Sequence, residues 1–240
     1  MEFSVDGQPT YVYTGARDFD PSRPSIAFVH GGGLDHCVWM LQSRYLAHHG
    51  YNTLALDLPG HGRSAGTPPG SIEHMADWTV RAIDALGVEK FAVAGHSMGA
   101  LVALEVAART GERTMLAVLL GISVPMPVTD LLLSAAKAND HAAFDMVNLW
   151  GHGYTAQIGG NPSPGMWMTG GAVRLLERSA PGVLHNDLNA CNSYTAGLES
   201  AKKIASRVHV ILGKNDIMAS PKAAKAVISA LSDVRVTELP

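Results

Sequence analysis

A serine at position 97 has the surroundings that suit chemistry best in this sequence. It lies in the stretch VAGHSMGA, residues 93–100, between Gly95 and Gly99 and between two apolar runs. On a tight turn from strand to helix, a serine is pushed outward, and only small residues fit two positions before and after it. The free N–H groups of the following helix would lie beside a developing negative charge. The stretch predicts a nucleophile, although glycines that merely punctuate a turn give the same short pattern.

The elements that must position this serine alternate along most of the chain. Apolar runs predict strands at residues 25–30, 52–56, 91–94, 116–120, 208–212 and 234–239, after an antiparallel start near 11–15. Helical spacing predicts helices at 38–49, 72–86, 98–109 and 221–231, with Ser71 and Ser220 before two of them and Gly50, Gly87 and Gly111 at helix ends. This alternation predicts an α/β protein with a mostly parallel sheet covered by helices.

The alternation stops between residues 124 and 206, where we expect no strand. Helical patterns occupy residues 130–150, 172–179 and 196–206, and a loop rich in glycine and proline spans 159–165. The methionine and tryptophan content of this segment gives it apolar surface to bury. We therefore expect a core made of residues 1–123 and 207–240, with residues 124–206 as a folded helical insertion.

Composition favours a small molecule as the partner. The chain has 240 residues, 18 basic against 21 acidic, so no field of one sign suggests nucleic acid or a membrane surface. No basic stretch leads into a long apolar segment near Met1, so we expect neither a secretory signal nor a membrane helix. Cys37 and Cys191 are too few for a disulfide framework or a metal cluster, which favours the cytoplasm. No feature indicates an oligomeric state.

Four motifs in order along most of the chain resemble those of the α/β-hydrolase family. They are VHGGG at 29–33, DLPGHGRS at 57–64, GHSMG at 95–99 and GKNDIMASP at 213–221, each at the end of an expected strand. The resemblance implies an α/β-hydrolase fold with a helical cap inserted after the sixth strand. It also implies that Ser97 is the catalytic nucleophile and Asp216 the catalytic acid, which orients a histidine base.

The resemblance assigns the glycine loop to the oxyanion hole. The N–H of Met98 and an N–H from Gly32 or Gly33 would both donate to the oxyanion, and which of the two glycines donates stays open. A phosphate-binding loop is the alternative, but the spacing of a P-loop or dinucleotide fingerprint is absent. In the family, the 57–64 loop braces its neighbours, and His30 and His96 serve as hydrogen-bonding scaffold groups.

The substrate of such an enzyme would lie beneath the cap. We expect the pocket to be lined by His30, Leu34, Trp39, Met126, Trp150 and Trp167, with simple packing as the alternative for each.

The expected base departs from the family pattern. In the family the histidine follows the last strand, yet no histidine follows Asp216 here, and the final helix expected over the sheet is also missing. We therefore expect a sequence cut short before its base and hydrolysis that is very slow or absent. His141, His152 and His185 in the cap are alternative bases, whereas His209 opens a strand at the wrong end.

The expected activity is cleavage of a small, largely apolar carboxylic ester, lactone or related acyl compound through an acyl-enzyme. This serine hydrolase chemistry requires no metal and no organic cofactor. A C–C bond hydrolase or an acyltransferase would use the same serine. A non-catalytic ligand-binding protein on the same fold is the third alternative, which the missing histidine favours.

Overall fold

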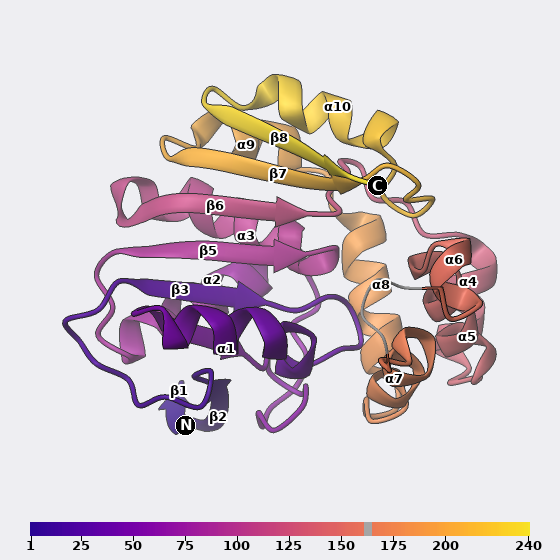
Figure 1. The fold of residues 1–240 in the computed structure, drawn as a ribbon, viewed down its shortest axis with the longest axis horizontal. Coiled ribbons are helices and arrows are strands. Elements are labelled where there is room, and N and C mark those ends of the chain that lie inside the picture. Colours follow the sequence, from indigo (N-terminus) through magenta and orange to yellow (C-terminus); the bar gives the residue numbers. More distant parts are fainter. Residues whose placement is uncertain (161–164) are drawn as a thin grey trace.

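An eight-stranded sheet runs through the computed structural model, which describes residues 1–160 and 165–240 (Figure 1). The strands are β1 (Glu2–Val5), β2 (Gln8–Tyr13), β3 (Ser25–Val29), β4 (Asn52–Leu56), β5 (Phe91–His96), β6 (Thr114–Leu120), β7 (Arg207–Gly213) and β8 (Val234–Leu239). Their order is β1-β2-β4-β3-β5-β6-β7-β8; β1 and β2 pair antiparallel, and β2 joins β4 antiparallel. The remaining pairs are parallel, as the apolar runs predict.

Helices cover both faces of this sheet. They are η1 (His36–Trp39) with α1 (Met40–His48), α2 (Ile72–Ala85), α3 (Met98–Thr110) with η2 (Gly111–Arg113), and α10 (Pro221–Ala230). The Ser71 and Ser220 side chains accept N–H bonds from His74 and Ala223, which confirms both expected helix starts. In Figure 1, α1 lies on one face and α2 and α3 on the other.

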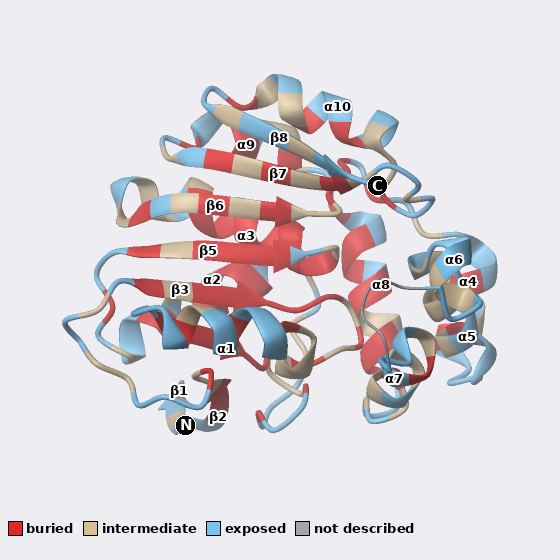
Figure 2. Ribbon diagram, viewed as in Figure 1, coloured by how far each residue is buried: buried red, intermediate tan, exposed pale blue. Residues whose placement is uncertain are grey.

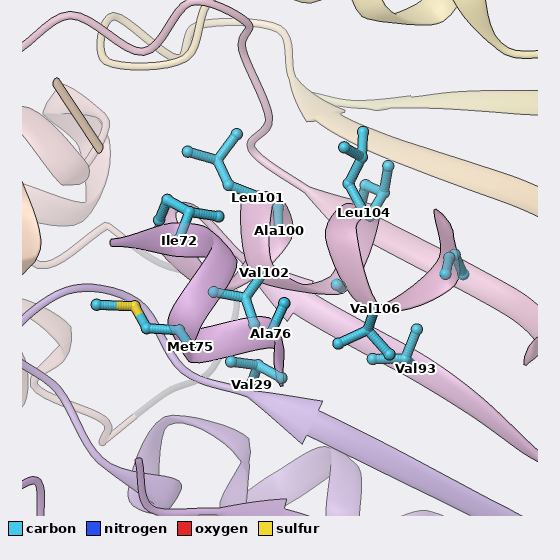
Figure 3. Close-up of a cluster of buried hydrophobic side chains, with 14 of the residues drawn as sticks. Val29, Ile72, Met75, Ala76, Val93, Ala100, Leu101, Val102, Leu104 and Val106 are labelled. Carbon is cyan, nitrogen blue, oxygen red and sulfur yellow. The ribbon is translucent and has the colours of Figure 1, made fainter. Parts of the chain in front are cut away.

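The main core lies between the sheet and the pair α2 and α3. Figure 3 shows Ile72, Met75 and Ala76 of α2 meeting Val102 and Val106 of α3 above the strands. A smaller cluster on the α1 face contains Phe28, Trp39, Ala55 and Ala94. Figure 2 shows β3 and β5 buried over most of their length. The turn that carries Ser97 therefore follows a closely packed strand.

One face of the sheet near β8 carries no helix among residues 1–160 and 165–240. In Figure 1, α1 lies in front of β3 and β4, whereas β6, β7 and β8 have nothing in front of them. Val118 of β6 and Ile211 of β7 are only half-buried, and Val236 of β8 is 42% exposed. This part of the sheet is therefore less covered than the part that packs against α1.

Helices alone connect β6 to β7 in the part of the chain that the structure describes. They are α4 (Asp130–Lys137), α5 (Ala142–Gly151), α6 (Tyr154–Gln157), α7 (Met168–Leu176), α8 (Val183–Ser193) and α9 (Gly197–Lys203). Figure 1 places α4 to α8 beyond the strand tips, with α8 between the sheet and the others. By contrast, α9 packs against α3 and α10 and so lies with the core helices. Residues 161–164 of the expected 159–165 loop lie outside the described residues.

Two expectations for this helical segment are wrong. The single helix predicted over 130–150 is interrupted at Asn139. This residue adopts a left-handed φ of 53°, and its side-chain oxygen accepts the Gly182 N–H at 2.6 Å. Asparagine reaches this backbone region more easily than other residues with a side chain, so the chain turns there. The helix α8 is also absent from the sequence prediction, and it carries a residue central to the site. No helix in the described ranges has the length and hydropathy needed to span a bilayer.

Candidate active site

Ser97 sits at the turn between β5 and α3 in a strained backbone conformation. Its φ is 55° and its ψ is −118°, and its N–H donates to the Leu120 carbonyl at 2.9 Å. A Cβ on Gly95 would lie 1.8 Å from the Gly99 carbonyl oxygen, and one on Gly99 would lie 2.2 Å from the Val29 carbonyl oxygen. No side chain fits at either position, which confirms the steric role predicted for both glycines. Ser97 itself remains partly exposed.

The glycine loop after β3 forms a turn beside this serine. The Leu34 N–H donates to the Gly31 carbonyl at 3.2 Å, and Gly33 has a φ of 68°, the region that glycine reaches without penalty. The Gly33 N–H donates to the Asp187 carboxylate at 2.8 Å. Gly32 is partly exposed, and a Cβ there would lie 3.9 Å from the Met98 sulfur. Because the Gly33 N–H is already bonded, Gly32 is the remaining candidate in the loop for an oxyanion donor.

Asp216 lies on the loop that follows β7. Its Oδ1 accepts the N–H groups of residues 218 and 219, each at 2.8 Å, which fixes the carboxylate on its turn. A Cβ on Gly121, just after β6, would lie 3.6 Å from Asp216 Oδ2 and 3.7 Å from the His96 ring. Asp216 and His96 are therefore neighbours at the carboxyl edge of the sheet, and His96 directly precedes Ser97.

His30 is fully buried at the end of β3. Its Nδ1 is 2.9 Å from the Gly31 carbonyl, and its Nε2 accepts the Leu58 N–H at 3.2 Å. Burial and the neighbouring His61 lower the pKa of His30 to about 4, so the ring is neutral. With 0% exposure, His30 cannot line a pocket. The expectation that His30 lines the pocket is therefore wrong, whereas its expected scaffold role agrees with its hydrogen bonds.

His61 lies beside His30, with the ring centroids 4.8 Å apart, but the surroundings of His61 shift its pKa in the opposite direction. Its Nδ1 is 3.0 Å from the Pro59 carbonyl and its Nε2 is 2.8 Å from the Asp187 carboxylate. Burial acts to lower the pKa of His61, but the hydrogen bond and charge of Asp187 outweigh it and raise the pKa above 6.5. The two adjacent histidines thus favour different protonation states.

Asp187 is the site residue that sequence reasoning missed. It is 0% exposed in α8, and besides Gly33 and His61 it accepts a bond from the Asn186 side chain at 3.2 Å. The residue belongs to no motif, and α8 was not expected. A signal exists all the same, because Asp187 shares the buried side of α8 with Leu184 and Leu188. An acidic residue on an apolar helix face needs partners.

The loop at 57–64 is braced as expected. Asp57 accepts the His36 N–H at 2.7 Å, the His36 ring at 2.8 Å and the Arg63 N–H at 2.9 Å. Burial acts to raise the pKa of Asp57, but the bonds from His36 and Arg63 lower it below its ordinary value. The Ser64 hydroxyl donates to the Asp57 carbonyl and accepts the Tyr11 N–H.

Comparison with known proteins places this arrangement in a family. A model described as "Alpha/beta hydrolase family" matches residues 26–240. The chain belongs to the alpha/beta hydrolase family. An enol-lactonase from Burkholderia xenovorans LB400 has a similar structure, with a TM-score of 0.84 at 20% identity over 100% of this chain and 91% of that one. That likeness shows the shared fold.

Curated alpha/beta hydrolase relatives match over different lengths. A putative non-heme haloperoxidase of Mycobacterium phage D29 is 34% identical over 55% of this chain, and the match spans only 50% of that protein's length. A putative carbamate hydrolase of Agrobacterium fabrum is 30% identical over 77% of this chain and 66% of its own length. The names of these relatives describe them, not this chain.

The other residues expected in the hydrolase pocket separate into three groups. Leu34 is half-buried, and its side chain lies near Gly31 beside His96. Trp39 and Met126 belong to core clusters, where Trp39 packs on Phe28 at 5.0 Å between ring centroids. Their packing places them in the core, because the fold needs large apolar groups there. Trp150 packs inside the helical segment, and Trp167 is 77% exposed.

Histidines offered as alternative bases mostly have other partners. His141 is exposed and bonds Glu177 at 2.8 Å and Asp145 at 3.1 Å, and these bonds raise the pKa of His141. His152 Nδ1 lies 2.8 Å from the Asn148 carbonyl. His209 is bonded to Thr237 at 2.9 Å. His185 is half-buried on α8.

One group of potential metal ligands occurs in the described part of the chain. Ligand atoms of Asp35, His36 and Cys37 all lie within 4.8 Å of one another. The Arg178 guanidinium already pairs with Asp35 at 3.2 Å, and burial raises the pKa of the Cys37 thiol to about 11. A cation would face Arg178 and a protonated thiol, which disfavours metal binding there.

Proposed function

We propose that this chain is a serine hydrolase that cleaves a small, largely apolar carboxylic ester, lactone or related acyl compound through an acyl-enzyme. The observation that carries the proposal is the strained, partly exposed Ser97, whose chain neighbours Met98 and His96 lie near Gly32 and Asp216 respectively. Strain of this kind costs about 1–3 kcal/mol and is concentrated at functional sites. The names of the relatives, a carbamate hydrolase and an enol-lactonase, are consistent with acyl chemistry.

The proposed mechanism begins with attack of Ser97 Oγ on a carbonyl carbon. The oxyanion that forms would accept hydrogen bonds from the N–H groups of Met98 and Gly32. Each bond would contribute about 3 kcal/mol to transition-state stabilisation. Asp216 Oδ2 would orient an imidazole that takes the serine proton and passes it to the leaving group. Residues 217–240 contain no histidine, so we infer that a polypeptide of residues 1–240 alone reacts slowly.

A ligand-binding role without catalysis is the second candidate. The observation that favours it is that His141, His152 and His209 each already bond another group. In this case the partly exposed turn at Ser97 and Gly32 would form one wall of a binding pocket. Transfer to another acceptor and C–C bond hydrolysis remain variants of the first candidate, because they use the same nucleophile.

Chemical rescue separates these candidates. We expect a fluorophosphonate probe to label the chain slowly, and added imidazole to speed labelling and p-nitrophenyl acetate cleavage in proportion to its free base, whose pKa lies near neutrality. The Ser97→Ala variant should show no labelling, and its ester cleavage should not exceed the rate of imidazole in buffer alone, because imidazole itself cleaves this ester. If labelling stays absent with imidazole present, the hydrolase proposal fails and the binding role is favoured.

A further inference from the structure

The buried carboxylate of Asp187 joins two loops of the core to the helical segment. Its Oδ2 accepts the Gly33 N–H and lies 2.8 Å from His61 Nε2, and residue 187 is separated from residue 33 by 154 positions. Because α8 stands between the strand tips and the outer helices, this contact is where the helical segment meets the glycine loop (Figure 1). Leu184 of α8 adds apolar contact, since a Cβ on Gly33 would lie 2.9 Å from it.

The bonds around His61 indicate its charge. Both ring nitrogens face acceptors, the Pro59 carbonyl at 3.0 Å and the Asp187 carboxylate at 2.8 Å. A neutral imidazole donates from one nitrogen only, whereas an imidazolium donates from both. The other titratable groups that face this ring are the neutral His30 at the end of β3 and the Asp57 carboxylate after β4. His61 and Asp187 therefore form a buried ion pair.

This pairing matters for an oxyanion formed nearby. A Cβ on Gly32 would lie 3.2 Å from Asp187 Cβ and 3.8 Å from Asp187 Oδ2, so the carboxylate lies close to the proposed hole. An uncompensated negative charge there would oppose an oxyanion, and the imidazolium of His61 offsets it. At the same time, the bond to Gly33 fixes the turn that presents Gly32.

We propose that Asp187 is a positioning residue whose hydrogen bond to Gly33 holds the Gly31–Leu34 turn in its working conformation, while its ion pair with His61 offsets the charge of the carboxylate beside the oxyanion. Packing of α8 against the core therefore also orders the turn that would form the oxyanion hole. The catalytic consequence of this inference rests on the proposed function. The contact between Asp187 and Gly33 can be measured without any activity.

The test compares Asp187→Ala with the conservative Asp187→Asn, which keeps an acceptor for Gly33 but removes the charge. NMR hydrogen exchange of the Gly33 amide reports the contact, and the rate of fluorophosphonate labelling in imidazole reports the hole. We expect Asp187→Ala to speed Gly33 exchange and slow labelling, each at least about tenfold, since a misplaced donor costs up to about a hundredfold. Ester cleavage should lose kcat rather than gain KM, and Asp187→Asn should recover most of the Gly33 protection.

Glu105→Gln is the matched control. Glu105 is another buried carboxylate, bonded to Tyr194 and Ser200 away from the glycine loop. We expect its variant to lose stability while Gly33 exchange and labelling stay unchanged below its unfolding transition. If Asp187→Ala does not fold, His61→Gln replaces it, because glutamine still donates to Asp187 without a charge; we expect Gly33 to stay protected and labelling to slow.

Three results would overturn the inference. One is unchanged Gly33 exchange in Asp187→Ala, and another is an equal loss of protection in Asp187→Asn and Asp187→Ala. The third is unchanged labelling in His61→Gln. If the wild type shows no reaction that depends on Ser97, the proposed function fails separately, and Gly33 exchange still decides the positioning role.

Discussion

Ser97 occupies a backbone region that L-residues rarely adopt, and the backbone is closely packed two residues before and after it. The carbonyl oxygens of Gly99 and Val29 approach the backbone at Gly95 and Gly99 so closely that neither position has room for a Cβ. Close packing of backbone against backbone therefore maintains the strain at Ser97.

Replacing Gly95 with alanine tests this account at the level of one atom. The new Cβ would meet the Gly99 carbonyl oxygen at 1.8 Å, so backbone must shift. We expect Gly95→Ala to lower the free energy of unfolding by about 3 kcal/mol or more, measured by urea denaturation. The control is Gly70→Ala, where nothing lies within 4 Å, and its change should stay within about 0.5 kcal/mol. Equal effects of the two substitutions would contradict the steric role.

At the scale of elements, the helical segment depends on one turn between α4 and α5. Asn139 adopts a φ of 53° there, and its side-chain oxygen accepts the Gly182 N–H just before α8. The turn therefore separates α4 from α5 and ties this corner to the residue that precedes α8. Since α8 carries Asp187, this turn indirectly serves the glycine loop.

Two substitutions separate the backbone and side-chain roles of Asn139. Asn139→Gly loses the bond to Gly182 but keeps the left-handed conformation, at a cost of about 1 kcal/mol. Asn139→Ala loses both and should cost about 1–2 kcal/mol more in unfolding free energy. Thermal and urea denaturation measure the difference. An alanine variant as stable as the glycine variant would show that the conformation at position 139 is not constrained.

At the scale of the whole molecule, the buried histidines make stability depend on pH in opposite directions. The pKa of His30 falls from 6.5 to about 4 on folding, so the unfolded chain binds the extra proton between these values. Stability should therefore rise by about 3 kcal/mol from pH 4 to pH 6.5 through this group. The pKa of His61 is raised, so its contribution is complete below 6.5 and is lost as pH rises through its folded pKa.

Together these histidines predict maximum stability just above pH 6.5. Urea unfolding from pH 4 to pH 9 measures the profile. His30→Gln should flatten the acid limb and leave the alkaline limb, and His61→Gln should do the reverse. The slopes rather than the absolute stabilities decide the outcome, because both variants also lose hydrogen bonds. Unchanged slopes in both variants would show that other groups govern the pH dependence.

Much of the core was predictable because its signals are local. The six parallel strands begin and end within two residues of their predicted apolar runs, whereas the antiparallel strand β1 was not expected. Ser71 and Ser220 act as caps, and Gly95 and Gly99 frame Ser97, since each of these effects involves residues a few positions apart.

The amino-acid sequence alone determined the sheet, the serine turn and the family, because periodicity and short motifs act over neighbouring residues. Only the tertiary structure decided that the Gly33 N–H is already bonded, because Asp187 reaches Gly33 across 154 positions. It also decided the burial of His30 and Trp39 and the partners of His61. The burial of a residue and the partners of a buried charge depend on contacts between segments that are distant in the sequence. Local sequence patterns do not predict such contacts.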